Sequence, residues 1–175
     1  RSAQDTGNLG YKLALDGGLT VSVEAARNTT AGGTDNTYGV TYTGIDGLTL
    51  AAGTGMTATG GTAEVESTTF GVKYATGGLT VGLQITDVET EGTTEEEDGV
   101  YMGVTYNVND DFTIGYLRQE TDFSGSSSDE EHTGIQASYS MGSISFSGRV
   151  SKVDNMGGSA TASDEDKHIT MSIAF

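Results

Sequence analysis

The sequence predicts an all-β chain, because its apolar residues alternate with small or polar residues instead of recurring at helical spacing. The alternation is clear over residues 19–25, 79–85 and 169–175. A period of two places every apolar side chain of a strand on one face and the intervening side chains on the other. These segments are also rich in Thr, Val, Tyr and Ile, which favour strands over helices.

Turn residues divide the chain into about eleven strands, joined by connections that are alternately short and long. The short connections are rich in Gly, Asp and Asn, as in residues 16–18 and 46–47. The expected strands cover residues 9–15, 19–26, 38–45, 48–54, 68–76, 79–87, 99–107, 112–119, 132–140, 143–152 and 167–175. The sequence Gly-Val-x-Tyr recurs at residues 39–42, 71–74 and 103–106, so that one repeat corresponds to one hairpin and one long connection.

The face opposite the apolar one decides between a sandwich and a barrel. In a sandwich that face would meet solvent and be rich in Lys and Glu, whereas here it holds mainly small and hydroxylated side chains with few charges. One apolar face, one polar face, strands of about ten residues and turns of unequal length are typical of a transmembrane antiparallel β-barrel. A closed sheet is also the β-structure that pairs every backbone group within hydrocarbon.

Composition excludes several classes of function. The net charge of −17 argues against nucleic acid as a partner, because phosphate binding requires clustered cations. The absence of Cys excludes disulfides, thiol catalysis and Cys-based metal sites. His132 and His168 are the two histidines, and no distinctive His–Ser–acid spacing accompanies them, so we expect no enzyme. The alternative is a barrel protease or lipase, which would lose activity when either histidine is replaced.

The last strand carries a family resemblance. Residues 169–175 resemble the C-terminal strand of Gram-negative outer-membrane barrels, which ends in Phe. Together with the Gly-Val-x-Tyr hairpins, the acidic long connections and the lack of Cys, the whole chain resembles the C-terminal part of general porins of the alphaproteobacterial type. The resemblance implies a homotrimer of 16-stranded barrels in the bacterial outer membrane. It also implies extracellular long loops, with the short turns and the C-terminus in the periplasm.

Single-chain barrels of this kind have an even number of strands, whereas about eleven are expected here. We therefore expect residues 1–175 to form one transmembrane domain that lacks an odd number of N-terminal strands, five for a 16-stranded barrel. The expected function is passive diffusion of small hydrophilic solutes and ions, with a weak preference for cations because the loops and wall are acidic. The alternatives are a substrate-selective porin of the same fold and a soluble β-solenoid adhesin, since solenoids also repeat at short periods.

Strand parity assigns candidate functional side chains to each face. The expected pore-lining residues are Lys12, Glu24, Lys73, Gln84, Tyr101, Gln136, Arg149 and His168. The outward-facing aromatic residues near the short turns, expected at the membrane interface, are Tyr42, Tyr74, Tyr106, Phe112, Tyr139 and Phe175. The outward-facing cations at the opposite strand ends, expected to bind lipopolysaccharide phosphates, are Arg27, Arg118, Lys152 and Lys167.

The densest group of acidic residues falls in and around the long connection over residues 88–98. Its expected metal ligands are Glu91, Glu95, Glu96, Glu97 and Asp98. Carboxylate oxygens are the ligands that Ca²⁺ and Mg²⁺ prefer, so this loop is a candidate divalent-cation site. The alternative is a solvated loop whose charges repel one another. No other cofactor is expected.

Overall fold

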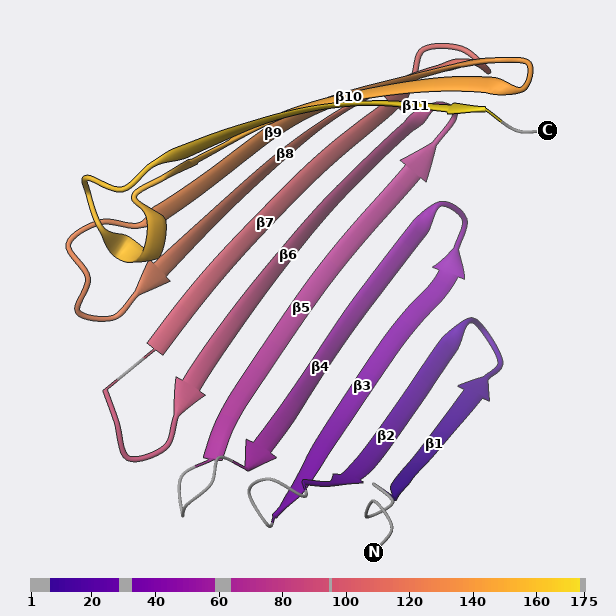
Figure 1. Ribbon diagram of the computed structural model, residues 1–175. Helices are drawn as coiled ribbons and strands as arrows, with labels where there is room; N and C mark the ends of the chain where they lie inside the picture. Colours follow the sequence, from indigo (N-terminus) through magenta and orange to yellow (C-terminus); the bar gives the residue numbers. More distant parts are fainter. Residues whose placement is uncertain (1–6, 29–32, 59–63, 95, 174–175) are drawn as a thin grey trace, which may run out of the picture.

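The strands of this protein form one antiparallel sheet. The computed structural model describes residues 7–28, 33–58, 64–94 and 96–173. Within these residues eleven strands pair in the order of the sequence, so that β1 and β11 form the two edges of the sheet (Figure 1). The elements are β1 (Asn8–Leu15), β2 (Leu19–Arg27), β3 (Thr34–Ile45), β4 (Leu48–Ala58), β5 (Glu64–Thr76), β6 (Leu79–Thr90), β7 (Glu96–Asn107), β8 (Phe112–Phe123), β9 (Glu130–Met141), β10 (Ile144–Asp154), the 3₁₀ turn η1 (Met156–Gly158) and β11 (Asp164–Ile173).

This topology confirms the all-β prediction. Every pair of neighbouring strands is antiparallel, which differs from the parallel coils of a β-helical solenoid, so the solenoid alternative is wrong. In the part of the chain that the structure describes, no helix is long and apolar enough to cross a membrane.

The strand boundaries agree with the predictions at the short turns and differ at the long connections. The strands extend up to four residues further into those connections than expected: β3 begins at Thr34, β5 begins at Glu64 and β8 ends at Phe123. The additional residues are mostly acidic, small or polar and lack the apolar alternation. Strand pairing needs only backbone groups, so it continues beyond the end of the apolar face.

The two faces of the sheet are separated throughout the register. Antiparallel partners share a face: Leu83 lies opposite Val72 and Met102, and Arg149 lies opposite Gln136 and His168. Among the described residues no hydrophobic side chain is buried, and Leu83 is 41% exposed. Two sheets packed around a dry core would bury these side chains. An apolar face of this extent instead requires another apolar medium to cover it.

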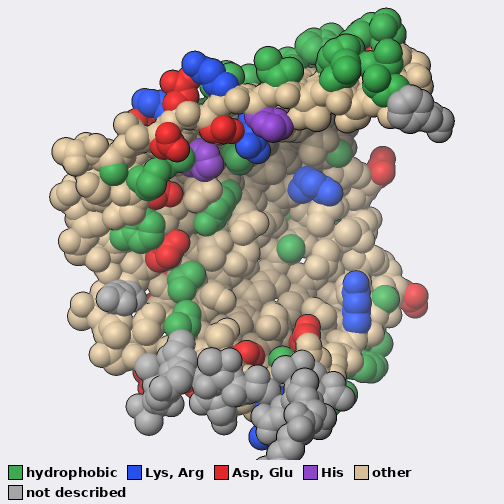
Figure 2. All heavy atoms as spheres, viewed as in Figure 1, with side chains coloured by type: hydrophobic (Ala, Val, Ile, Leu, Met, Phe, Trp, Pro, Cys, Tyr) green, Lys and Arg blue, Asp and Glu red, His purple; other side chains and the backbone are tan. Residues whose placement is uncertain are grey.

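Curvature places the polar face on the inside. Figure 1 shows a sheet bent into a trough, with β8 to β11 folding over the remaining strands. Figure 2 looks into this trough, whose surface consists mainly of polar side chains and backbone with scattered Lys and Arg. Hydrophobic side chains gather on the outer side, over β10 and β11. The polar face is therefore concave and the apolar face is convex.

The long loops lie at one end of the sheet and the short turns at the other (Figure 1). Hydrogen bonds join consecutive long loops. Ser124 Oγ donates to the Thr94 carbonyl oxygen and accepts from the Glu96 backbone N–H, each at 2.7 Å. Asn155 Nδ2 donates to the Asp129 carbonyl oxygen at 2.9 Å. These contacts tie the β6–β7, β8–β9 and β10–β11 loops into one cluster at this end of the sheet.

The separation of faces predicts unequal losses of stability for two neighbouring substitutions in β6. We expect Leu83→Arg to lower the free energy of unfolding by about 2–4 kcal/mol, because a cation at the middle of a lipid-facing strand loses its hydration. Gln84→Arg, on the concave face, should cost much less. Urea unfolding of the protein refolded in lipid vesicles measures both values. Equal losses for the two variants would contradict the assignment of the faces.

Candidate functional site

The concave face carries the residues with the chemistry for contact with solutes. The register places all the expected pore-lining residues on this face; for example, Lys12 lies opposite Ser22, and Gln84 lies opposite Gly71 and Tyr101. It also adds Gln119, His132 and Asp166, which the sequence predictions did not include. Gln119 and His132 fall within the predicted strands over 112–119 and 132–140, so strand parity alone could have found them; Asp166 lies in the part of β11 that precedes the predicted strand.

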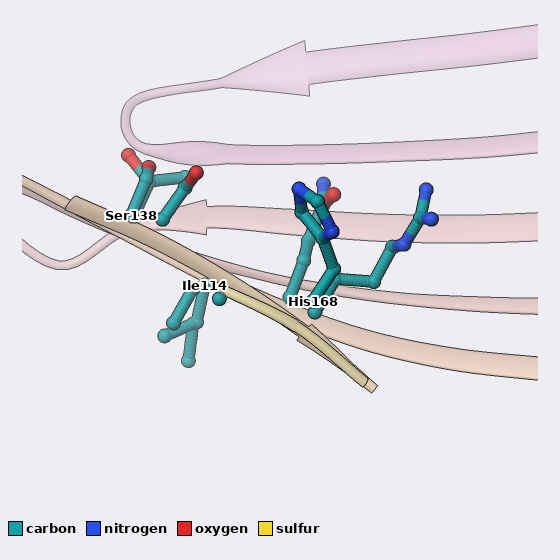
Figure 3. Close-up of a pocket in the computed structure, with 9 residues that line it drawn as sticks. Ile114, Ser138 and His168 are labelled. Carbon is teal, nitrogen blue, oxygen red and sulfur yellow. The ribbon is translucent and has the colours of Figure 1, made fainter. Parts of the chain in front are cut away.

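A cross-strand row of polar side chains runs over β9, β10 and β11. Gln136 lies opposite Arg149, which lies opposite His168. Figure 3 shows that Ser138 and His168 project from the same side of the sheet, whereas Ile114 projects from the other. The polar side chains line a hollow of about 340 Å³ on the concave face.

Charges of both signs lie on the concave face. Arg149 Nη2 is 3.1 Å from Asp166 Oδ2, and the two side chains are 60% and 56% exposed. An ion pair this exposed contributes little to stability, because water screens it. Glu24 accepts a hydrogen bond from Asn8 Nδ2 at 3.4 Å on the opposite part of the sheet. The charged side chains are therefore held loosely and remain accessible to solutes.

Glycines make much of the concave face bare backbone. The strand glycines that the register places on this face include Gly39, Gly53, Gly71, Gly82, Gly99, Gly103, Gly115 and Gly134. Gly71, Gly82 and Gly103 line a second, shallow hollow of about 400 Å³ beside Lys73 and Tyr101. Absent side chains leave more room inside the trough than a wall of larger residues would.

Tyr101 lies along the wall instead of projecting from it. A Cβ atom added to Gly99 would lie 2.7 Å from Tyr101 Cε2 and 2.9 Å from Tyr101 Oη, so the ring occupies the space over Gly99. Thr121 lies opposite Gly99 and is 1% exposed. At Gly103, two residues beyond Tyr101, the atom nearest to an added Cβ is 4.0 Å away. Gly99 is therefore the position that accommodates the ring.

The two histidines do not come together. His168 lies opposite Arg149, whereas His132 lies in another cross-strand row, opposite Gln119 and Val153. His132 was expected as the first residue of the strand over 132–140, and it belongs to β9 and lies on the concave face. The strand itself begins two residues earlier than expected, at Glu130, before the apolar alternation does.

The predicted interface aromatic residues that are described lie on the convex face near the short turns. Tyr42 lies opposite Leu19 and Leu50, and Phe112 lies opposite Tyr139. Tyr74 lies between apolar residues of β4 and β6, and Tyr106 lies between apolar residues of β6 and β8. Phe175 lies outside the described residues.

The predicted lipopolysaccharide-binding cations lie on the convex face towards the long loops. Arg27 is the last residue of β2 and lies opposite Thr34. The other three are in ion pairs, which are Arg118 with Glu120 at 2.9 Å and Glu131 at 3.3 Å, Lys152 with Asp154 at 2.6 Å, and Lys167 with Glu165 at 2.8 Å. A phosphate group would therefore compete with carboxylates of the same chain for these cations.

The predicted acidic loop is mostly a strand. Glu96, Glu97 and Asp98 belong to β7, Glu91 follows β6, and Glu95 lies outside the described residues. Alternation in β7 sends Glu97 to the concave face and its two neighbours to the convex face, so these carboxylates diverge. Among the described residues no three acidic or His side chains converge to hold a metal ion, and the structure does not support the expected Ca²⁺ or Mg²⁺ site.

Comparisons with known proteins identify the family through a family model and the fold through solved structures. A family model described as "Gram-negative porin" matches residues 2–174. A search of curated proteins finds no match. The chain resembles a porin whose structure was refined at 1.8 Å resolution, with 16% identity and a TM-score of 0.78, over 99% of this chain and 63% of that one. It also resembles an anion-selective porin from Comamonas acidovorans, with 16% identity and a TM-score of 0.70, over 84% of this chain and 48% of that one.

A third similar structure is the outer-membrane-expressed OmpT of Vibrio cholerae, with 18% identity and a TM-score of 0.63, over 94% of this chain and 61% of that one. The chain thus spans between about half and two thirds of the length of these solved relatives. At such identities the likeness concerns the fold: a sheet of the kind that forms the wall of a porin barrel.

The packing of Tyr101 over Gly99 predicts a specific effect of Gly99→Ala. The added methyl group would displace the ring into the trough, and we expect hydroxyl-radical oxidation of Tyr101 to increase. Mass spectrometry of the labelled protein measures this oxidation residue by residue. Gly103→Ala, which adds a methyl group to the same strand and face without such contact, is the matched control. Unchanged oxidation of Tyr101 in Gly99→Ala would show that the ring does not depend on the bare backbone.

Proposed function

Because the chain belongs to the Gram-negative porin family, we propose that it forms part of the wall of a water-filled outer-membrane channel. Small hydrophilic solutes and ions pass through this channel by passive diffusion. The observation that carries the proposal is the difference between the two faces of the sheet. The concave face consists mainly of polar side chains and exposed backbone, whereas the convex face carries apolar side chains, none of which is buried among the described residues. A polar lining replaces part of the hydration shell of a solute, and wall charges bias the choice of ions.

In the whole protein, these strands belong to a closed barrel of sixteen strands, and residues 1–175 contribute one transmembrane domain to it. Open edges are costly in hydrocarbon because unpaired N–H and C=O groups find no water there. The edges of β1 and β11 therefore need strand partners. Three such barrels form the native assembly. A solved trimer form of the OmpT of Vibrio cholerae, 17% identical with a TM-score of 0.58, supports this arrangement.

The difference between the two ends of the sheet supports a proposed orientation. The linked long loops face the exterior, and the short turns and the C-terminus face the periplasm. Long loops on one side and short turns on the other are the usual arrangement in outer-membrane barrels. Acidic residues near the external ends of the strands draw cations towards the mouth, which gives the channel a weak preference for cations.

Outward-facing cations contact the phosphates of lipopolysaccharide. Their position on the convex face towards the long loops supports this contact, because the proposed orientation would put the headgroups of the external leaflet beside these strand ends; the residues are Arg27, Arg118, Lys152 and Lys167. We expect the double variant Lys152→Gln/Lys167→Gln to retain less lipopolysaccharide on purification than the parent protein. Lys12→Gln, which removes a cation from the concave face, is the control. Equal retention in all three proteins, measured by phosphate analysis of the purified samples, would contradict this contact.

Planar-bilayer recording of the full-length protein tests the channel itself. We expect ohmic current steps that occur in multiples of three, because each inserted trimer adds three pores. Under a salt gradient, the reversal potential should shift slightly from zero towards the Nernst potential of the cation. Silence at every voltage would overturn the proposal, and single steps that never occur in threes would overturn the trimer.

A further inference from the structure

The hollow on the concave face of β8 to β11 is lined mainly by residues whose side chains can donate hydrogen bonds. Gln136, Arg149 and His168 form one cross-strand row. The next row towards the short turns carries hydroxyl groups, which include Thr113, Ser138 and Ser147 and which line the same hollow. Figure 3 shows that Ser138 and His168 stand on the same side of the sheet, facing the interior of the trough.

The donors match an oxyanion better than a cation or an apolar group. The guanidinium of Arg149 has five N–H donors and no acceptor, and its planar fork fits the two oxygens of a carboxylate or phosphate. Gln136 adds amide N–H groups, and the hydroxyls of Ser138 and Ser147 can each donate one hydrogen bond. No carboxylate lines this hollow.

Asp166 lies on the other side of the row. It precedes His168 by two residues in β11, towards the long loops, whereas the hydroxyl groups lie towards the short turns. Its Oδ2 engages Arg149 Nη2 at 3.1 Å, and 60% of the arginine side chain remains exposed. An exposed pair of this kind is weak, so an incoming anion can share or replace the carboxylate.

We propose that Arg149, Gln136 and His168, with the neighbouring hydroxyl groups, form a binding subsite for the carboxylate or phosphate group of a passing solute. Asp166 tunes the subsite by competing for the guanidinium of Arg149. The proposal rests on the channel function proposed above and refines it: the external acidic residues act on ions at the mouth, whereas this subsite acts on anionic groups inside. It assigns to these side chains a combined role that goes beyond lining the pore.

Inorganic phosphate and acetate are the test anions, applied to the full-length protein in planar bilayers. We expect phosphate to reduce the chloride current at saturating concentrations, and Arg149→Gln to weaken its apparent affinity about tenfold or more, since a charge-assisted hydrogen bond is lost. Arg149→Lys keeps the charge without the fork and should give an intermediate affinity. Asp166→Asn should strengthen binding, because it frees the guanidinium. Stronger binding of acetate than of phosphate would assign the subsite to carboxylates, and the reverse order to phosphates.

Lys73→Gln is the matched control, because Lys73 is a cation of the same face that lies outside the hollow. If Lys73→Gln and Arg149→Gln weaken phosphate binding equally, the subsite is overturned, because the overall electrostatic field of the wall would then account for the binding. Calorimetric titration of the detergent-solubilised protein with phosphate separates the two proposals. Binding that depends on Arg149 would support the subsite even in a protein that conducts no current. Conduction without any anion binding would overturn the subsite and leave the channel intact.

Discussion

The pairing of backbone groups within an apolar medium is the constraint from which this architecture follows. A strand that crosses hydrocarbon must give every N–H and C=O group a partner on a neighbouring strand. The chain meets this requirement for β2 to β10 with a meander in which each of these strands pairs with the strands before and after it, and β1 and β11 have one partner each. Once the backbone is paired in this way, side-chain parity alone decides what meets lipid and what meets water. Few tertiary contacts other than strand pairing are then needed, which explains the lack of a buried hydrophobic core among the described residues.

The same parity shows on which face each charged residue of a strand lies. Most acidic residues in the strands lie on the convex face near the long loops, including Glu66, Asp87, Glu89, Glu96, Asp98, Glu120, Asp122, Glu131, Asp154 and Glu165. The concave face carries Lys12, Lys73 and Arg149 together with a smaller set of acidic residues, which are Glu24, Asp35, Glu97, Glu130, Asp164 and Asp166. Both faces of the described strands therefore carry more acidic residues than cations. The proposed site for anions depends on the local hollow around Arg149, which no carboxylate lines, and not on the charge of the whole face.

The sequence predicted the fold where one side of a strand had to be apolar, and it failed where that requirement ended. Most short-turn ends, such as that of β6 at Leu79, were predicted to the residue, and those of β9 and β10 to within one residue, because Gly-rich turns adjoin strong alternation. At the long-loop ends, acidic and hydroxylated residues pair through their backbones without an apolar pattern. Glu96 was therefore expected in a loop although it belongs to β7, and the strand that contains His132 was expected to begin two residues later than β9 does. The row from Gln136 to His168 was predicted as separate pore-lining residues, because only the register shows which of them are neighbours.

Glycine on the concave face links the fold to the proposed transport. A glycine in a strand gives up side-chain packing and weakens the strand, so its repeated placement on one face needs a compensating benefit. Here the bare backbone enlarges the interior, and at Gly99 it also provides a surface on which the Tyr101 ring lies. An inward-pointing aromatic residue would otherwise narrow the passage. The ring instead covers backbone that would be open to water, so the wall regains packing at a bare position without losing width. The width of the proposed pore is thus set partly by where side chains are absent.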